Sequence, residues 1–424
     1  MFKQILSTIG VKAFSAIANF SIVIITAQFF GAEGRGYISL IIAAISLVSM
    51  FSNFIGGTTL TYLVSRENIS NLILTSYVWI ISVSSVAFIL INYLQLMEDE
   101  ENTRIFFLSM LFALTAINQN ILLGYQKIKK YNIITVVQSL VQIISLVVYL
   151  YIFKEKNISV FITTLYISYG LAFILSCFFI SKYLQISLRT DIMQVAITAF
   201  QFGAIAQLAN LFQFISYRYA YVVLNNPNNQ TDVGIYSTAV SISEAVWLIS
   251  GAISIVQYSK ISNTEDPKVA QELTLKLSKF SLLLTVLAMA FLLLLPDTFY
   301  VFLFGKDFTG VKAIMLTLTM GIVSLGYSIV FSHYFSGLGK YYVNTIVSFV
   351  GMIVTIVLSK LLIPKYGIPA AGWISSVTYL LGTICLVVYF LYHSKINVKR
   401  LFVSSSDIVD FKNVLSNVWN SRIS

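Results

Sequence analysis

The chain has 424 residues, of which 58% are hydrophobic and only 10% are charged, and its mean hydropathy is +0.85. This composition leaves too little polar surface for a soluble globular protein, so that class is excluded. The net charge of +10 comes from basic residues scattered over short segments, which argues against a nucleic-acid-binding surface. The chain is therefore expected to be an integral membrane protein.

Twelve apolar stretches follow one another, each long enough to cross a bilayer as a helix. Continuous apolar runs predict helices, because a span in lipid must satisfy its own backbone hydrogen bonds. The predicted spans cover residues 8–30, 37–62, 71–94, 103–124, 131–153, 159–181, 192–223, 233–257, 278–304, 310–337, 341–364 and 368–393. The predicted fold is an all-α polytopic membrane protein with no extramembrane domain.

Basic residues are concentrated in the loops that follow even-numbered spans, and the positive-inside rule places such loops in the cytoplasm. These residues include Lys127, Lys129, Lys130, Lys182, Arg189, Lys260, Lys268, Lys276, Lys279 and Lys340. Because the number of spans is even, both termini are then cytoplasmic, and residues 395–424 form a cytoplasmic tail. The loop lysines are also expected to contact anionic membrane lipids.

The two sets of six spans share short sequence patterns. Ala18-Asn19 followed by Gly36-Tyr37-Ile38-Ser39 in the first half corresponds to Ala209-Asn210 followed by Gly234-Ile235-Tyr236-Ser237 in the second. Since six is even, both halves enter the membrane from the same side, as in transporters with parallel repeats. The pattern predicts an N-terminal six-helix bundle over residues 1–184 and a C-terminal one over 185–394, around a central cleft that opens alternately to each face.

Several segments resemble one known family when they are taken in order. They are Ala27-Gln28-Phe29-Phe30-Gly31-Ala32-Glu33-Gly34-Arg35-Gly36, then Ser216-Tyr217-Arg218, the run from Gly234 to Trp247, Gly337-Leu338-Gly339-Lys340, and the run from Leu361 to Gly372. Together they are similar to the polysaccharide (O-antigen) flippases of the multidrug/oligosaccharidyl-lipid/polysaccharide exporter superfamily. One departure is Ala220, where members of that family often carry an acidic residue.

The resemblance implies a function. A flippase of this kind moves an oligosaccharide linked to undecaprenyl diphosphate from the inner to the outer leaflet of the bacterial cytoplasmic (inner) membrane, for O-antigen, capsule or exopolysaccharide synthesis. The expected partners are this lipid-linked oligosaccharide, the membrane lipids, and the glycan polymerase and synthesis enzymes. No nucleic acid is expected.

Polar residues inside the spans are candidates for substrate binding, because such groups are costly in lipid unless they face a cavity or a partner. Helical spacing places Lys12 and Asn19 on one face of the first span, and Gln207, Asn210 and Arg218 on one face of the seventh. Two cations facing each other across the cleft would suit a diphosphate. The alternatives are that Lys12 extends to the lipid headgroups and that Arg218 forms a structural ion pair.

Glu244 and His333 are the candidates for ion coupling. Glu244 in the eighth span either neutralises Arg218 or binds and releases H⁺ or Na⁺ as the cleft changes sides. His333 in the tenth span is either a proton-coupling group or a neutral hydrogen-bonded residue. Beyond this H⁺ or Na⁺ coupling, which stays open, no cofactor is expected.

Enzymatic activity is not expected. The sequence contains no phosphate-binding glycine loop, no catalytic triad and no cluster of metal-ligating residues, so no catalytic or metal site is predicted. Cys177 and Cys385 fall inside spans and are expected to be reduced thiols. Two alternatives to the flippase are a cation-coupled drug or metabolite exporter of the same superfamily and a scaffold of a glycan assembly complex that transports nothing.

Overall fold

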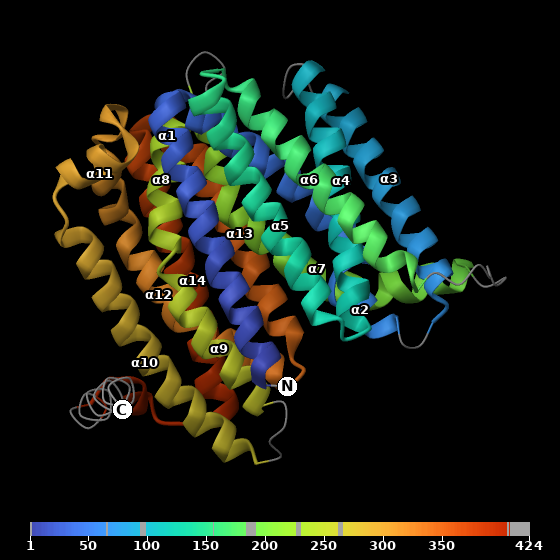
Figure 1. Cartoon of the computed structure of the whole chain (residues 1–424). Helices are drawn as coiled ribbons and strands as arrows, with labels where there is room; N and C mark the ends of the chain where they lie inside the picture. The colour runs from blue at the N-terminus through green and yellow to red at the C-terminus, as the bar shows by residue number, and fades with distance from the viewer. Residues whose placement is uncertain are drawn as a thin grey trace, which may run out of the picture. The chain divides into compact units, whose positions relative to one another are not determined.

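The protein is described from a computed structural model that covers residues 2–64, 67–93, 99–155, 157–183, 192–225, 230–261, 266–404 and 407. Within these ranges every regular element is a helix (Figure 1). Nine of the described helices are long and apolar enough to cross a membrane, and the bent pair α8 (Thr231–Glu244) and α9 (Trp247–Ile261) makes a tenth candidate. The all-α polytopic fold is confirmed.

All twelve predicted spans fall on helices. Helix α1 (Phe2–Ser52) contains the first span and most of the second, which are separated by a break in helical geometry at Gly31 (φ 67°, ψ −171°). The second span continues past α1 through residues 53–62, where extended backbone at Gly56 interrupts the helix. Helix α7 (Ile192–Leu224) occupies the seventh predicted span. The predicted ninth span is interrupted instead of continuous: α10 (Pro267–Leu294) is followed by the separate short helix α11 (Asp297–Phe304). Pro296 explains the interruption, because it disfavours helical geometry at Leu295, which is extended.

The chain divides into two compact units. Unit 1 contains Met1–Phe214, Asn225–Ile235 and Val301–Phe308, and unit 2 contains Ile215–Leu224, Tyr236–Tyr300 and Thr309–Ser424. Helices α7, α8 and α11 therefore contribute residues to both units. The predicted boundary at residues 184 and 185 lies outside the described residues, and the division into two six-helix bundles stays a prediction.

Unit 1 is built around α4 (Asp99–Gly124), which packs against α2 (Gly57–Leu63), α3 (Ile69–Tyr93) and α6 (Ser159–Ser181). Helix α5 (Ile128–Val147) continues as the π-helical turn η2 (Val148–Ile152) and packs between α1 and α6 (Figure 1). The short helix η1 (Asn53–Ile55) joins α1 to α2. Aliphatic side chains of these helices form the buried core of the unit, because their apolar faces are turned toward one another.

In unit 2 the central helix is α12 (Val311–Gly337), which packs against α9, α10 and α14 (Ile368–Ser394). Helix α13 (Tyr341–Tyr366) lies along α14. Small and hydroxyl residues allow close contact between α12 and α14: a Cβ added to Gly321 would lie 2.5 Å from the Ser376 Cα atom. Close packing of small residues is how helices associate in lipid, where burial from water supplies no driving force.

The loops meet in the two groups that alternate crossing predicts. In unit 1, the segment around Gly31–Gly36 contacts Gln230 and the short helix η3 (Lys306–Phe308), which belong to odd-numbered loops. Even-numbered loops meet one another elsewhere in the same unit, where Lys130 contacts Tyr183. Such grouping requires that successive spans run in opposite directions. Which group faces the cytoplasm remains a prediction from the charge distribution.

The glycine-rich segment that carried the family resemblance is a close backbone junction in unit 1. A Cβ added to Gly234 would lie 1.8 Å from the carbonyl oxygen of Ala32, and one added to Gly36 would lie 2.0 Å from that of Gln230. The Ala32 amide donates to Asp307 Oδ2 at 3.3 Å, and Gln28 Nε2 donates to the Leu303 carbonyl at 2.9 Å. Glycine is needed here because the backbones touch.

The start of the C-terminal tail docks on α10 within unit 2. Arg400, in the turn η4 (Val398–Leu401), pairs with Glu272 at 2.6 Å, and Lys279 pairs with Asp407 at 2.8 Å. Burial alone would raise the pKa of Asp407, but hydrogen bonds from Lys279 and Ser404 outweigh it and lower the pKa from 3.8 to about 2. Most of the predicted tail, residues 408–424, lies outside the described residues.

This pKa gives docking of the tail a defined pH dependence. A carboxyl group whose pKa falls on docking stabilises the docked state fully above its ordinary value, and that contribution is lost as the pH falls from about 4 to about 2. Docking should therefore be independent of pH between 6 and 8. Asp407→Asn should speed tryptic cleavage after Arg400 several-fold at pH 7.5, as followed by mass spectrometry. Asp297→Asn is the control, and an unchanged rate in Asp407→Asn would rule out this docking role.

Candidate substrate and coupling site

An ion pair inside the spans joins Arg218 of α7 to Glu244 of α8, both in unit 2. The guanidinium donates to the carboxylate in a bidentate arrangement, Nη1 to Oε1 at 2.7 Å and Nη2 to Oε2 at 2.8 Å. The two side chains are 26% and 18% exposed. A planar guanidinium paired with a carboxylate has a fixed geometry. Because the pair is partly exposed, the outer edge of the guanidinium stays accessible to a further ligand.

Glu244 lies at a break in its transmembrane segment. It is the last residue of α8, and α9 begins at Trp247 with its axis bent by 42°. At the break the backbone hydrogen bonds join residues three apart, as in a 3₁₀ turn. The Val246 amide donates to the Ser243 carbonyl and the Leu248 amide donates to the Ala245 carbonyl, each at 3.2 Å. Irregular backbone at membrane depth is tolerated where it is buried in protein or lines a cavity, and broken helices form substrate and ion sites in many transporters.

Aromatic side chains lie near this ion pair. The rings of Tyr217, Trp247 and Tyr379 contact one another, with centroids 5.0 to 5.8 Å apart. The Arg218 guanidinium carbon lies 5.4 Å from the centroid of the Tyr221 ring, which holds the cation by its π face. Trp247 donates from Nε1 to the Ile322 carbonyl, so its ring is fixed in orientation. The result is a charged centre with rigid aromatic walls.

Four of the five predicted substrate-binding residues lie in unit 1. Lys12 and Asn19 are exposed on α1. Gln207 is buried on α7 and accepts a hydrogen bond from Asn210, from Nδ2 to Oε1 at 3.3 Å. Arg218 belongs to unit 2. The structure therefore brings Gln207 to Asn210 and Arg218 to Glu244, whereas a cleft with Lys12 facing Arg218 stays a prediction.

The described contacts of His333 involve neither Arg218 nor Glu244. Its Nδ1 is 2.9 Å from the carbonyl oxygen of Ile329, one turn earlier in α12, and its ring packs edge-on against Tyr258. A hydrogen bond to the helix backbone fixes the tautomer of a neutral imidazole, with the proton on Nδ1. Among the described residues, no group of three or more His, Cys, Asp or Glu residues is placed to hold a metal ion.

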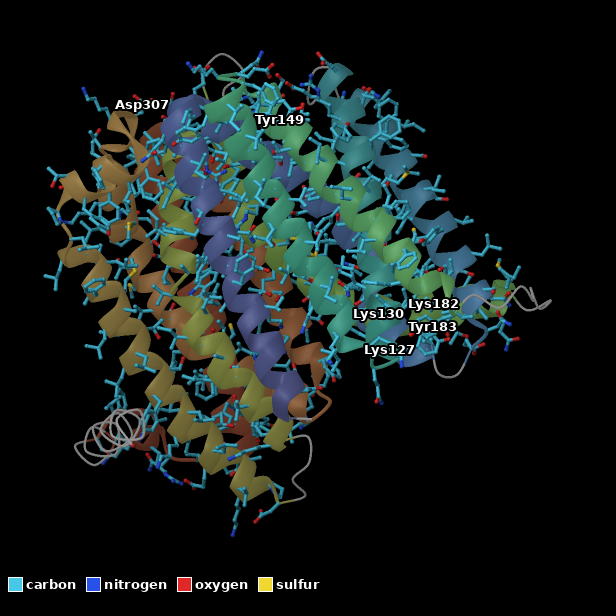
Figure 2. The ribbon with its side chains drawn as sticks, in the orientation of Figure 1. Lys127, Lys130, Tyr149, Lys182, Tyr183 and Asp307 are labelled. Atoms are coloured by element: carbon cyan, nitrogen blue, oxygen red, sulfur yellow. The ribbon has the colours of Figure 1, made fainter. Side chains whose placement is uncertain are left out.

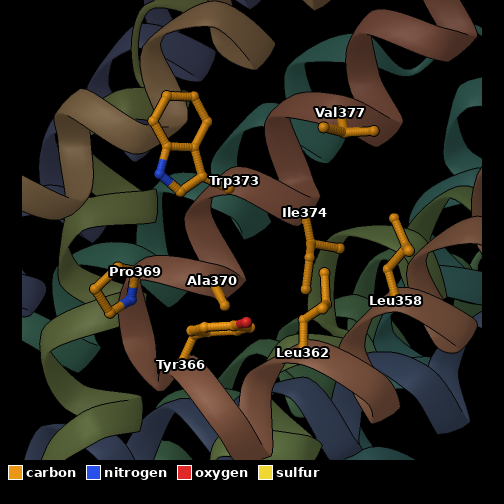
Figure 3. A pocket seen from close by; sticks show the side chains of 8 residues that line it. All are labelled: Leu358, Leu362, Tyr366, Pro369, Ala370, Trp373, Ile374 and Val377. Carbon is orange, nitrogen blue, oxygen red and sulfur yellow. The ribbon is translucent and has the colours of Figure 1, made fainter.

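A separate apolar pocket of about 410 Å³ lies between α13 and α14 of unit 2 (Figure 3). It is lined by Leu358, Leu362, Tyr366, Pro369, Ala370, Trp373, Ile374 and Val377. These side chains offer no charge and almost no hydrogen-bonding group to a ligand. The pocket therefore offers no charged group to a diphosphate, and it does not contain any of the predicted site residues.

Sequence reasoning missed the helix break and the aromatic walls. The break contains neither proline nor glycine, the two residues that usually signal one. Tyr217 and Trp247 were read only as parts of a family pattern. Their position beside Arg218 and Glu244 in sequence was the available signal, because large polar aromatics inside a span need hydrogen-bond partners. Arg35, assigned to a loop, is also buried.

Comparison with known proteins agrees with this architecture. No family model matches the chain. The capsular polysaccharide biosynthesis protein CapF of Staphylococcus aureus is 23% identical over 282 residues, which cover 64% of this chain and 69% of CapF.

Solved structures match over almost the whole chain. The lipid II flippase MurJ in an inward closed conformation has a TM-score of 0.73 and 17% identity, covering 99% of this chain and 100% of MurJ. An inward-facing multidrug resistance MATE transporter of the MOP superfamily has a TM-score of 0.66 and 13% identity, covering 90% and 94%. The MATE multidrug transporter DinF-BH has a TM-score of 0.64 and 19% identity, covering 94% and 96%. The fold that the sequence resemblance implied is thus confirmed, and this multi-pass membrane protein has the fold of the MOP-superfamily transporters and flippases.

Proposed function

We propose that the protein is a flippase that moves a polyprenyl-diphosphate-linked oligosaccharide from the inner to the outer leaflet of the bacterial cytoplasmic membrane. The glycan would serve capsule, O-antigen or exopolysaccharide synthesis. Both termini are cytoplasmic in this proposal, as the distribution of loop lysines favours. Glycan polymerase and synthesis enzymes are the proposed protein partners.

The observation that carries the proposal is the Arg218–Glu244 centre at the break between α8 and α9. A guanidinium already held by a carboxylate and by the Tyr221 ring is oriented before the substrate arrives, so little side-chain entropy is lost on binding. The diphosphate would contact its accessible rim, and the walls of Tyr217, Trp247 and Tyr379 would stack on sugar rings. The polyprenyl tail would stay in the lipid.

Lys12 and Asn19 of α1 and Gln207 and Asn210 of α7 are the other proposed contacts. Lys12 and Asn19 are exposed on α1, as a surface that lines a cleft requires. Glu244 has two proposed roles. In the first it only positions Arg218; in the second the incoming diphosphate displaces it from the arginine, and it then binds H⁺ or Na⁺ until release. His333 is a proposed coupling group only in the second case.

The flippase proposal is tested by deleting the chain in its native host and measuring surface glycan and the lipid-linked intermediate. Loss of surface glycan with accumulation of the intermediate on the cytoplasmic side, restored by the wild-type chain, is the expected result. Purified protein in vesicles should then move a fluorescent lipid-linked oligosaccharide between leaflets. Normal surface glycan in the deletion strain would refute the proposal, and cation-driven dye export would favour a drug exporter. Loss of glycan without transport in vesicles would indicate a scaffold.

A further inference from the structure

Three lysines gather beside aromatic rings at one end of unit 1 (Figure 2). Lys127 caps the start of α5 and its carbonyl accepts from the Lys130 amide at 2.9 Å, so both lie within one turn. Lys130 Nζ donates to the Tyr183 hydroxyl at 3.3 Å, and Lys182 precedes Tyr183 at the end of α6. We call Lys127, Lys130 and Lys182 the lysine cluster.

The aromatic rings hold Lys130 in a defined position. Its ammonium lies 4.9 Å from the centroid of the Tyr183 ring and 5.4 Å from that of Phe179, and Tyr125 stacks on Tyr183 with centroids 4.8 Å apart. Lys182 Nζ lies 5.9 Å from the Phe178 ring centroid. A surface lysine normally loses much rotamer entropy when it binds a ligand, and this loss is reduced where rings already restrict the side chain.

The charge of the lysine cluster is not neutralised by the described part of the chain. No described carboxylate forms a salt bridge with any of the three lysines. Lys127 and Lys182 are exposed and Lys130 is half-buried. The geometry favours an anion, which could come from a soluble phosphate or from a lipid headgroup.

The surface that leads to the cluster selects between these two sources. Ile174 and Phe178 are 65% and 60% exposed on α6, two turns and one turn before Lys182 on the same helix face. In a membrane-spanning helix such an exposed apolar face contacts lipid chains, and on α6 this face ends at the ammonium group of Lys182. Apolar contact along a span followed by lysine at its end fits one molecule with a hydrocarbon chain and a phosphate.

We propose that the lysine cluster binds the phosphate of an anionic phospholipid whose acyl chain lies along Ile174 and Phe178. This site lies within unit 1, involves none of the residues assigned to substrate transport, and does not rest on the flippase proposal. It makes the stability of the protein depend on the headgroup of the surrounding lipid. The expected ligand is phosphatidylglycerol rather than the zwitterionic phosphatidylcholine.

The test measures the thermal unfolding temperature of the purified full-length protein in detergent with added phosphatidylglycerol, phosphatidylcholine or soluble glycerol 3-phosphate. Phosphatidylglycerol alone should raise the Tm by several degrees. The triple variant Lys127→Gln/Lys130→Gln/Lys182→Gln should lose most of this rise. The matched control Lys154→Gln/Lys306→Gln/Lys365→Gln removes the same charge from odd-numbered loops. This variant should retain the full rise in Tm with phosphatidylglycerol.

A milder variant keeps the proposal testable if the triple variant does not fold. Tyr183→Phe removes only the hydroxyl that accepts from Lys130, and it should weaken retention of phosphatidylglycerol about twofold in native mass spectrometry. Equal loss of the Tm rise in the two triple variants would overturn the proposal, since charge alone would then explain it. An equal rise with glycerol 3-phosphate or phosphatidylcholine would also overturn it.

Discussion

Arg218→Ala is expected to abolish transport and to destabilise unit 2. The substitution leaves the Glu244 carboxylate without its bidentate partner at a helix break. Breaking a buried pair costs roughly 3–5 kcal/mol, and because both side chains keep some exposure we expect about 2–3 kcal/mol here. The measurements are surface glycan in the complemented deletion strain and the Tm of the purified variant.

A second variant separates the structural role from substrate binding. Arg218→Gln/Glu244→Gln removes both charges but keeps side chains that can hydrogen-bond to each other, so stability should return to within about 1 kcal/mol of wild type. Glycan export should remain lost, because the neutral amide cannot attract a diphosphate. Normal export in this double variant would show that the pair only holds α7 and α8 together, and would remove Arg218 from the proposed binding site.

Gly234→Ala is expected to prevent normal packing of unit 1. The new Cβ would lie 1.8 Å from the Ala32 carbonyl oxygen, and three atoms of the α1 backbone lie within 3.1 Å of it. Backbone cannot move aside as a flexible side chain can, so the substitution should cost more than the roughly 1–3 kcal/mol typical of overpacking. The amount of folded protein extracted from membranes, followed by size-exclusion chromatography, should fall several-fold.

Gly170→Ala in α6 is the matched control for this effect. Both glycines are helical, so both substitutions gain the same helix propensity of about 1 kcal/mol. A Cβ at Gly170 meets nothing within 4 Å. Gly170→Ala should therefore leave the folded yield unchanged or slightly raised. Similar yields for the two variants would show that α1 and α8 are not in backbone contact at this junction.

The charged centre shows how far residue types alone could predict a site. Arg218 and Glu244 stood out in the sequence because charge at membrane depth requires a partner or a cavity. Their bidentate geometry could not be predicted, since it depends on the register between α7 and α8. The helix break beside Glu244 gave no sequence signal, because no proline or glycine interrupts the segment. Trp247 could be recognised as unusual, but its position as a wall follows only from that break.

The sequence by itself determined that this chain is a membrane-spanning bundle of helices, because uninterrupted apolar runs have one stable backbone solution in lipid. It also determined the positions of the spans and singled out the charged residues that needed partners. Only the tertiary structure decided which glycines are contact points and that Lys130 lies between aromatic rings. These features depend on contacts between residues far apart in the chain, and local patterns of hydropathy carry no information about such contacts.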